Sequence, residues 1–330
     1  MLQKIKCKSG LFSSLILILT MGCARSAQSG ADQLAQSTPD IPQSITPQID
    51  LNPPILLVGD WEAPQPLPSP IDGEGDELEP FITLAGDELY LFYTPDLSVS
   101  EAKRVLDGIS GIYYSKKVHG VWSTPVMLEL DDKNTLNACV YTDGKTLWFC
   151  SIREGNYNKK GDYYTASLVD GAWRDWQNAG EQLNRIYDVD EIHLSADQNT
   201  MIFSAFLPNG YGYADLWQIH REGEGWSEPE NLGNVVNGPD EETFPYLSED
   251  GKELWFTSSS RAGYPGYAIF RSIGQDGAWG EPQEILSNYA SEVSIDRQGN
   301  LYFTHFLYDK NGELLGSKIY VAYKETNAIP

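Results

Sequence analysis

Short runs of alternating apolar and polar residues, separated by tight turns, recur along most of the chain. The apolar centre of one such run returns five times, at residues 89–92, 147–149, 201–203, 254–256 and 301–303. Two neighbouring copies begin at residues 201 and 254, 53 residues apart. Asp-Gly or Gly-Asn pairs lie between the runs, and this combination is typical of strands and hairpins rather than helices. The pattern therefore predicts an all-β protein built from repeats.

Each repeat holds four strand-like runs, and the fourth begins with a tryptophan. These tryptophans are Trp61, Trp122, Trp173, Trp226 and Trp279. Four-stranded units repeated at this period predict a β-propeller rather than a β-sandwich or a β-helix. The first tryptophan precedes any complete repeat, whereas the last repeat ends near residue 324 without one. We therefore expect a five-bladed propeller over residues 54–330, closed by an N-terminal strand from residues 55–67 in the last blade.

The first residues carry a targeting signal. Lys4, Lys6 and Lys8 precede an apolar run over residues 11–21, which is the layout of a secretory signal peptide over residues 1–22. Residues 19–23 resemble a bacterial lipobox, although Thr20 stands where Leu is usual. The resemblance implies cleavage before Cys23, lipidation of Cys23 and a protein anchored to a bacterial membrane, facing the periplasm or the cell surface. The alternative is an ordinary secreted protein with an incidental cysteine.

The remaining composition narrows the function classes. Residues 23–53 are rich in Ala, Gln, Ser, Thr and Pro, which predicts a flexible linker. The chain carries 23 Lys and Arg against 47 Asp and Glu, a formal net charge of −24, so a nucleic-acid partner is not expected. Cys139 and Cys150 flank a predicted hairpin in an exported chain. These two cysteines could form a disulfide, but the sequence does not fix the strand register that the bond requires.

The repeat that contains residues 246–258 resembles the WD-like repeat of TolB-type propellers, together with the following residues 261–267. The preceding segment 225–237 looks like the linker strand of envelope proteins that carry those repeats. The resemblance implies a periplasmic or surface-exposed binding scaffold in the cell envelope. We expect a monomeric chain with an envelope protein or a glycan as partner. TolB proteins have six blades and an added domain, so their role in the Tol-Pal system is not expected here.

Acidic residues recur near the start of the predicted inner strands. Alignment of the repeats on their turns places at equivalent positions Glu79, Asn137, Glu191, Phe244 and Glu292. Three carboxylates around a channel suit a glycoside hydrolase. Residues 79–93 faintly resemble the first acidic motif of five-bladed arabinanase-like hydrolases, where the acid is normally Asp and not Glu. The alternative is that these acids are solvated or accept hydrogen bonds from backbone amides at strand starts.

Other side chains predicted on the same face suit a ligand. These candidates are Arg153, Arg261, His193, His305, Tyr213 and Tyr264. Guanidinium groups bind carboxylates and tyrosines stack on sugars, but both also serve as ion-pair or packing groups within a protein. Acidic loops beginning at Asp72 suit Ca²⁺, although no calcium-loop spacing is present and solvated acids are the alternative. The sequence indicates no other cofactor, and an exported binding scaffold is favoured over a glycoside hydrolase.

Overall fold

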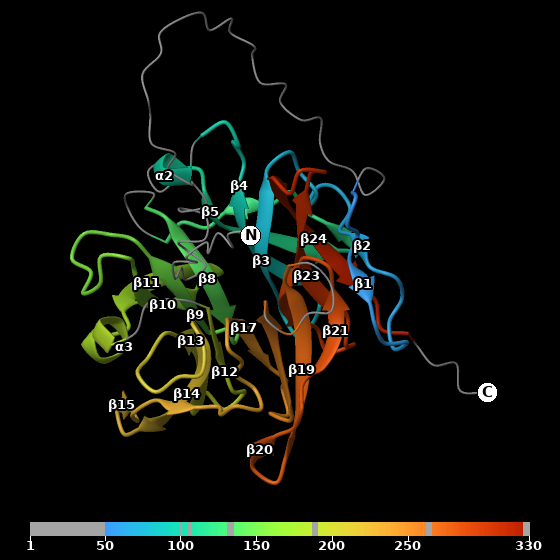
Figure 1. Ribbon diagram of the computed structural model, residues 1–330. Helices are drawn as coiled ribbons and strands as arrows, with labels where there is room; N and C mark the ends of the chain where they lie inside the picture. The colour runs from blue at the N-terminus through green and yellow to red at the C-terminus, as the bar shows by residue number, and fades with distance from the viewer. Residues whose placement is uncertain are drawn as a thin grey trace, which may run out of the picture.

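The computed structural model describes residues 50–99, 101–104, 107–130, 135–186, 191–259, 261 and 266–325. Its strands form five antiparallel sheets that follow one another in chain order around a common axis (Figure 1). The predicted five-bladed β-propeller is therefore confirmed. Among the described residues, no helix has the length and apolar character needed to cross a membrane.

The blades are built from consecutive strands. Blade one contains β3 (Asp76–Ile82), β4 (Glu88–Thr94), β5 (Gly111–Val118), β6 (Val121–Trp122) and β7 (Val126–Met127). Blade two contains β8 (Asn137–Thr142), β9 (Thr146–Ser151), β10 (Asp162–Val169) and β11 (Ala172–Asn178). Blade three contains β12 (Ile192–Leu194), β13 (Thr200–Ala205), β14 (Asp215–Glu222), β15 (Gly225–Trp226) and β16 (Glu230–Asn231).

The last two blades also take strands from the N-terminal segment. Blade four contains β17 (Glu242–Leu247), β18 (Glu253–Ser258), β19 (Ala268–Gln275), β20 (Ala278–Trp279), β21 (Gln283–Ser287) and β1 (Ile55–Leu56). Blade five contains β22 (Ala290–Ile295), β23 (Leu301–Tyr308), β24 (Leu314–Ala322) and β2 (Gln65–Pro66). The short helices α2 (Glu101–Arg104) and α3 (Glu181–Ile186) lie in connections between strands.

The outermost strands show how local sequence sets strand length. In blades one, three and four the outermost strand is divided into two short pieces. A proline lies between the pieces, at Pro125, Pro229 and Pro282. Proline has no N–H to donate to the ladder, so pairing breaks there. Blade two has no proline after its tryptophan, and β11 pairs with β10 over seven residues with one register shift.

The N-terminal segment closes the ring, but over a shorter range than predicted. Gln65 pairs with Val321, and Trp61 forms a bridge with Lys324, so residues 61–66 act as the fourth strand of blade five. Residues 55–56 do not join this strand. Ile55 pairs instead with Ser287 at the outer edge of blade four. The segment therefore holds blades four and five together as well as closing the ring.

The antiparallel order gives the propeller two distinct ends. The upper face, as we call it, carries the loops between second and third strands and the connections between blades. The lower face carries the turns between first and second strands and between third and fourth strands. Apolar side chains fill the space between neighbouring blades; Tyr141 and Trp148 of blade two, for example, belong to one buried cluster with Leu194 and Phe203 of blade three.

Trp61 offers a direct test of ring closure. Its indole N–H donates to the Gly299 carbonyl at 2.7 Å, and its ring packs edge-on against Trp255 at 6.0 Å. We expect Trp61→Ala to lower the free energy of unfolding by about 3–5 kcal/mol. Trp61→Phe keeps an aromatic ring but leaves the hydrogen bond unmade, and should cost less. Urea unfolding followed by circular dichroism measures both.

The control is Trp176→Ala, which removes a half-buried tryptophan from the outer strand of blade two, away from the closure. Equal losses for Trp61→Ala and Trp176→Ala would contradict a special role for the closing segment.

Candidate functional site

The inner strands share a bulge at one height along the axis. Ladder pairing shifts between Leu78 and Phe81 in blade one, and equivalent shifts occur in blades two, four and five. The residues at this height are Glu79, Cys139, Glu191, Phe244 and Glu292. Four of them have positive φ, with values of 51°, 56°, 51° and 59° for Glu79, Cys139, Phe244 and Glu292. A bulged residue lies outside the ladder, so its amide needs another acceptor.

Blade two places Cys139 at this height, not Asn137 as the sequence alignment predicted. The reason is the turn that follows. Thr142 pairs directly with Leu147, whereas Ile82 of blade one pairs with Leu89, so the turn of blade two is two residues shorter. Asn137 lies two residues earlier on β8 and therefore one level closer to the upper face.

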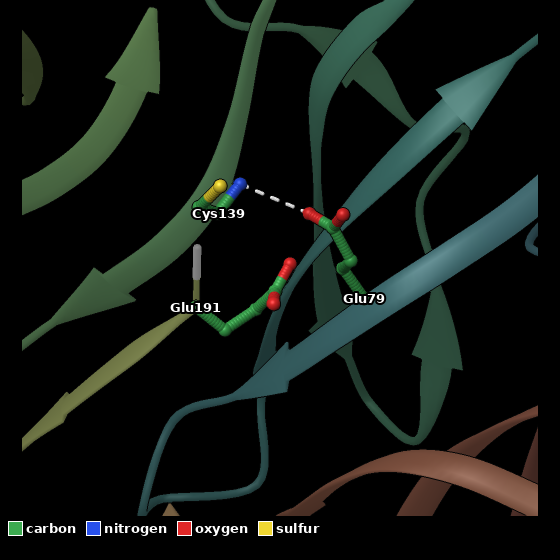
Figure 2. A group of neighbouring side chains, drawn as sticks. All are labelled: Glu79, Cys139 and Glu191. Atoms are coloured by element: carbon green, nitrogen blue, oxygen red, sulfur yellow. Dashed lines mark hydrogen bonds between the residues drawn. The ribbon is translucent and has the colours of Figure 1, made fainter. Parts of the chain in front are cut away.

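Two of the predicted carboxylates accept the bulge amides of neighbouring blades. The Glu292 carboxylate accepts the Glu79 N–H at 2.7 Å. The Glu79 carboxylate accepts the Cys139 N–H at 2.9 Å, the hydrogen bond drawn in Figure 2. The Thr304 hydroxyl also donates to Glu292. Glu292 thus links blade five to blade one, and Glu79 links blade one to blade two. Both acids accept backbone amides, which is one of the two alternatives that the sequence left open for them.

Glu191 approaches the same point from blade three. Figure 2 shows the carboxylates of Glu79 and Glu191 converging, and their oxygens and the Cys139 sulfur all lie within 4.8 Å of one another. All three side chains are buried. Such a group could hold a metal ion only in part, because the Cys139 sulfur belongs to a disulfide and is not a thiolate. Two carboxylates remain as donors.

The axial cavity at this height is small. Its wall includes Glu79, Glu191 and Glu292, together with Phe81 and Tyr246, and its volume is about 50 Å³. One water needs roughly 10–15 Å³ of such space. Ligand pockets for drug-sized molecules occupy about 300–1,000 Å³. The cavity therefore has room for a few waters but not for a sugar ring.

His193 of blade three is a packing residue that contacts blades two and four. Its ring lies 4.9 Å from that of Tyr141 and 4.5 Å from that of Tyr246, and Nδ1 accepts the Leu247 N–H at 3.2 Å. Burial lowers the pKa of His193 to about 3. The imidazole is therefore neutral at physiological pH, and its Nδ1 is already used within the protein.

The two arginine candidates bind groups of this chain. Arg153 donates to Asn137 Oδ1 at 2.9 Å, and its guanidinium lies 4.2 Å above the Tyr164 ring. Arg261 donates to the Val235 and Val236 carbonyls at 2.9 and 2.8 Å, and lies 3.8 Å from Glu242. Both guanidiniums hold connecting segments on the upper face.

His305 contacts the first described residue of the chain. Its Nε2 lies 2.8 Å from Asp50 Oδ2, and the side chains are 0% and 1% exposed. Close by, Asn288 donates to the Pro53 carbonyl at 2.7 Å. Residues 50–53 therefore lie on the upper face between blades four and five and cover His305. Nothing in the sequence pattern placed Asp50 there, because the contact joins residues 255 positions apart.

Exposed aromatic side chains gather on the upper face of blade three. Phe206 is 57% exposed, Tyr211 52% and Tyr213 39%, and all belong to the loop between β13 and β14. Tyr213 was predicted as a ligand residue, whereas Phe206 was not among the site candidates. The signal for Phe206 was available, since an aromatic residue directly follows a buried strand. Tyr264 and Cys23 lie outside the described residues.

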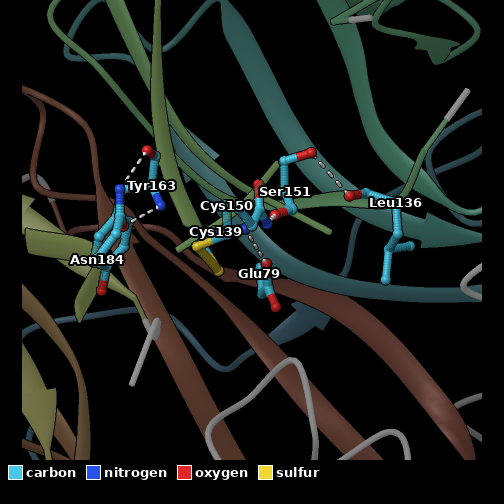
Figure 3. The surroundings of a disulfide bond; sticks show 8 residues. Glu79, Leu136, Cys139, Cys150, Ser151, Tyr163 and Asn184 are labelled. Atoms are coloured by element: carbon cyan, nitrogen blue, oxygen red, sulfur yellow. Dashed lines mark hydrogen bonds between the residues drawn. A yellow bond between two sulfur atoms is a disulfide. The ribbon is translucent and has the colours of Figure 1, made fainter. Parts of the chain in front are cut away.

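Cys139 and Cys150 form a disulfide within blade two, with Cα atoms 5.3 Å apart (Figure 3). The bulge brings them together, because Ala138 is the direct partner of Cys150 and Cys139 is the unpaired residue beside it. Neither sulfur-bearing residue is exposed by more than 3%. The bond thus fixes the bulge whose amide binds Glu79.

No family model matches the chain, and no curated protein matches it. TolB from Acinetobacter baumannii is similar in structure, with a TM-score of 0.44 and 13% identity over 77% of this chain and 56% of that chain. A thermostable family-43 glycoside hydrolase has a TM-score of 0.48 and 12% identity, over 78% of this chain and 93% of that chain. A GH43_12 protein from a capybara gut metagenome has a TM-score of 0.49 and 11% identity, over 78% of this chain and 54% of that chain. The chain thus spans about half the length of two of these proteins. Similarity at this level carries no information on ligand or activity.

His193 gives a pH-dependent prediction. His193→Phe keeps the ring between Tyr141 and Tyr246 but leaves the Leu247 amide without its acceptor, so we expect a loss of about 1–3 kcal/mol at pH 7. As pH falls from 6.5 towards 3, the unfolded wild-type chain takes up a proton that the buried ring refuses, so wild-type stability falls. The deficit of the variant should therefore shrink between pH 7 and pH 4.5 in urea unfolding. A deficit that stays constant or grows would show that the buried ring accepts the proton.

Proposed function

We propose that this protein is an exported, lipid-anchored protein of the bacterial cell envelope whose propeller binds a polypeptide or a glycan. The lipid on Cys23 would hold it to the membrane, and residues 24–53 would form the linker to a monomeric propeller. The aromatic loop of blade three carries the proposal, because Phe206, Tyr211 and Tyr213 are exposed on the face where the blade connections meet.

Hydrogen bonds to a buried carboxylate and to a backbone carbonyl hold this loop in place. The Asp215 carboxylate accepts the Tyr211 and Gly212 N–H groups at 2.6 and 2.9 Å, and Asp215 itself is 1% exposed. The Tyr213 N–H donates to the Asp240 carbonyl at 2.6 Å. Gly212 approaches this carbonyl so closely that a Cβ would lie 2.2 Å from it. An ordered loop that presents aromatic rings loses little entropy when it binds a partner.

A glycoside hydrolase is the second candidate, because carboxylate oxygens of Glu79 and Glu191 converge within 4.8 Å. Catalysis would need both acids to meet a sugar. The space between them is about 50 Å³, and the Glu79 carboxylate holds the Cys139 amide. These observations favour a structural role for the channel acids and support binding over hydrolysis.

Peptidoglycan sacculi test the proposal, because they present both glycan strands and peptides. We expect the protein to co-sediment with sacculi, and Tyr211→Ala with Tyr213→Ala to weaken binding about tenfold, in the range of aromatic interface residues. Leu168→Ala is the matched control, because it removes an exposed apolar side chain near the lower-face turn of blade two. A photo-crosslinking residue placed at position 211 in cells tests whether the partner is a polypeptide.

Two results would contradict this proposal. One is that the wild type binds but Leu168→Ala weakens binding as much as the two tyrosine substitutions do. The other is absence of both co-sedimentation and a specific crosslink. Release of reducing sugars from sacculi or arabinoxylan, abolished by Glu79→Gln or Glu191→Gln in a folded protein, would establish the hydrolase instead.

A further inference from the structure

The contact between blade five and blade one contains a buried lysine that the sequence did not single out. Lys318 lies on β24, and its side chain is 10% exposed. It reaches the acidic loop that leads into β3, residues 72–77, which reads Asp-Gly-Glu-Gly-Asp-Glu. The contact therefore joins the last strand of the chain to the first strand of the ring.

Four oxygen atoms surround the ammonium of Lys318. Two are backbone carbonyls, of Gly73 at 2.6 Å and Gly75 at 3.2 Å. Two are carboxylate oxygens, of Glu77 at 3.0 Å and Asp72 at 3.1 Å. All four come from a stretch of six residues. Carbonyl and carboxylate oxygens from one short loop are the donor set that Ca²⁺ prefers in proteins.

The glycines allow the loop to turn its carbonyls towards Lys318. A Cβ on Gly75 would lie 2.1 Å from the Thr94 carbonyl, and one on Gly73 would lie 2.8 Å from the Tyr93 hydroxyl. Any other residue at position 75 would push the loop away from β4. The oxygen cage is thus built into the backbone and does not depend on side-chain rotamers alone.

The cage holds two carboxyl groups against one ammonium. Asp72 and Glu77 both contact Lys318; burial raises the pKa of Glu77 to about 8, although the ammonium acts to lower it. Glu77 is 1% exposed, and its Oε2 has no hydrogen-bond partner among the described residues. Asp72 is 43% exposed at its side chain, which leaves the cage open to water on one side. A divalent ion in this position would take carboxylate and carbonyl oxygens from the loop and water from the open side, which are the ligands that Ca²⁺ uses.

We propose that this cage is a divalent-cation site of the Ca²⁺ type, in which the ammonium of Lys318 occupies the position of the ion. The lysine supplies the positive charge that joins blade five to blade one, so the ring closes without a metal ion. Removal of the ammonium leaves Asp72, Glu77 and the two carbonyls free to bind Ca²⁺, with waters entering past Asp72. The proposal is independent of what the upper face binds.

Lys318→Met tests the proposal in the full chain, because methionine fills the space without a charge. We expect the melting temperature in EDTA to fall on the order of 10 °C, since a buried ion pair loses one partner. Millimolar CaCl₂ should restore most of this loss, whereas the wild type should not respond. Tb³⁺ should give luminescence sensitised by Tyr93 in Lys318→Met but not in the wild type.

Two controls separate the cage from diffuse binding of Ca²⁺ to an acidic protein. Lys116→Met removes a half-exposed lysine that pairs with Glu88 at 2.8 Å, and it should show no response to CaCl₂. Adding Asp72→Asn to Lys318→Met should abolish the rescue. A folded Lys318→Met protein that ignores CaCl₂, or an equal response of all variants and the wild type, would overturn the proposal. If Lys318→Met does not fold in EDTA, its refolding from urea with CaCl₂ or EDTA gives the same test.

Discussion

Closure of the ring is the constraint on which the rest of this structure depends. Each blade buries both of its faces against neighbours, so the last blade is stable only if it meets the first. The pairing of Gln65 with Val321 completes blade five, and Lys318 joins that blade to the loop before β3. Residues distant in sequence therefore meet at one place, and the chain cannot lose either end of the propeller without exposing an apolar face.

The bulges explain why acids line the axis. A bulged residue turns its amide out of the ladder, and a buried amide without an acceptor costs about 1–3 kcal/mol. Glutamate reaches across to the next blade and accepts that amide, as Glu292 does for Glu79 and Glu79 for Cys139. The axial positions of Glu79 and Glu292 thus follow from backbone geometry, so the presence of these two carboxylates is explained without catalysis.

The sequence predicted features that follow from local patterns and missed those set by register. Periodic apolar runs and the tryptophan markers were enough for five blades and for closure by the N-terminal segment. The two-residue difference in the turn after β8 moved Cys139 to the bulge, and no pattern in the chain revealed it. The partners of Arg153 and Arg261 were equally hidden, because they are mostly backbone carbonyls and an amide oxygen, which carry no residue signature.

These contacts also decide what the upper face offers to a partner. Arg153, Arg261 and Lys318 lie towards this face, and each donates hydrogen bonds to oxygens of its own chain. His305 is covered by Asp50 in the same way. An anionic partner that paired with these three cations would have to break these bonds, at a cost that desolvated ion pairs make high. The aromatic loop of blade three has no such cost, because its rings are exposed while its backbone is already ordered. Contact with these rings would therefore leave the bonds of Arg153, Arg261 and Lys318 intact.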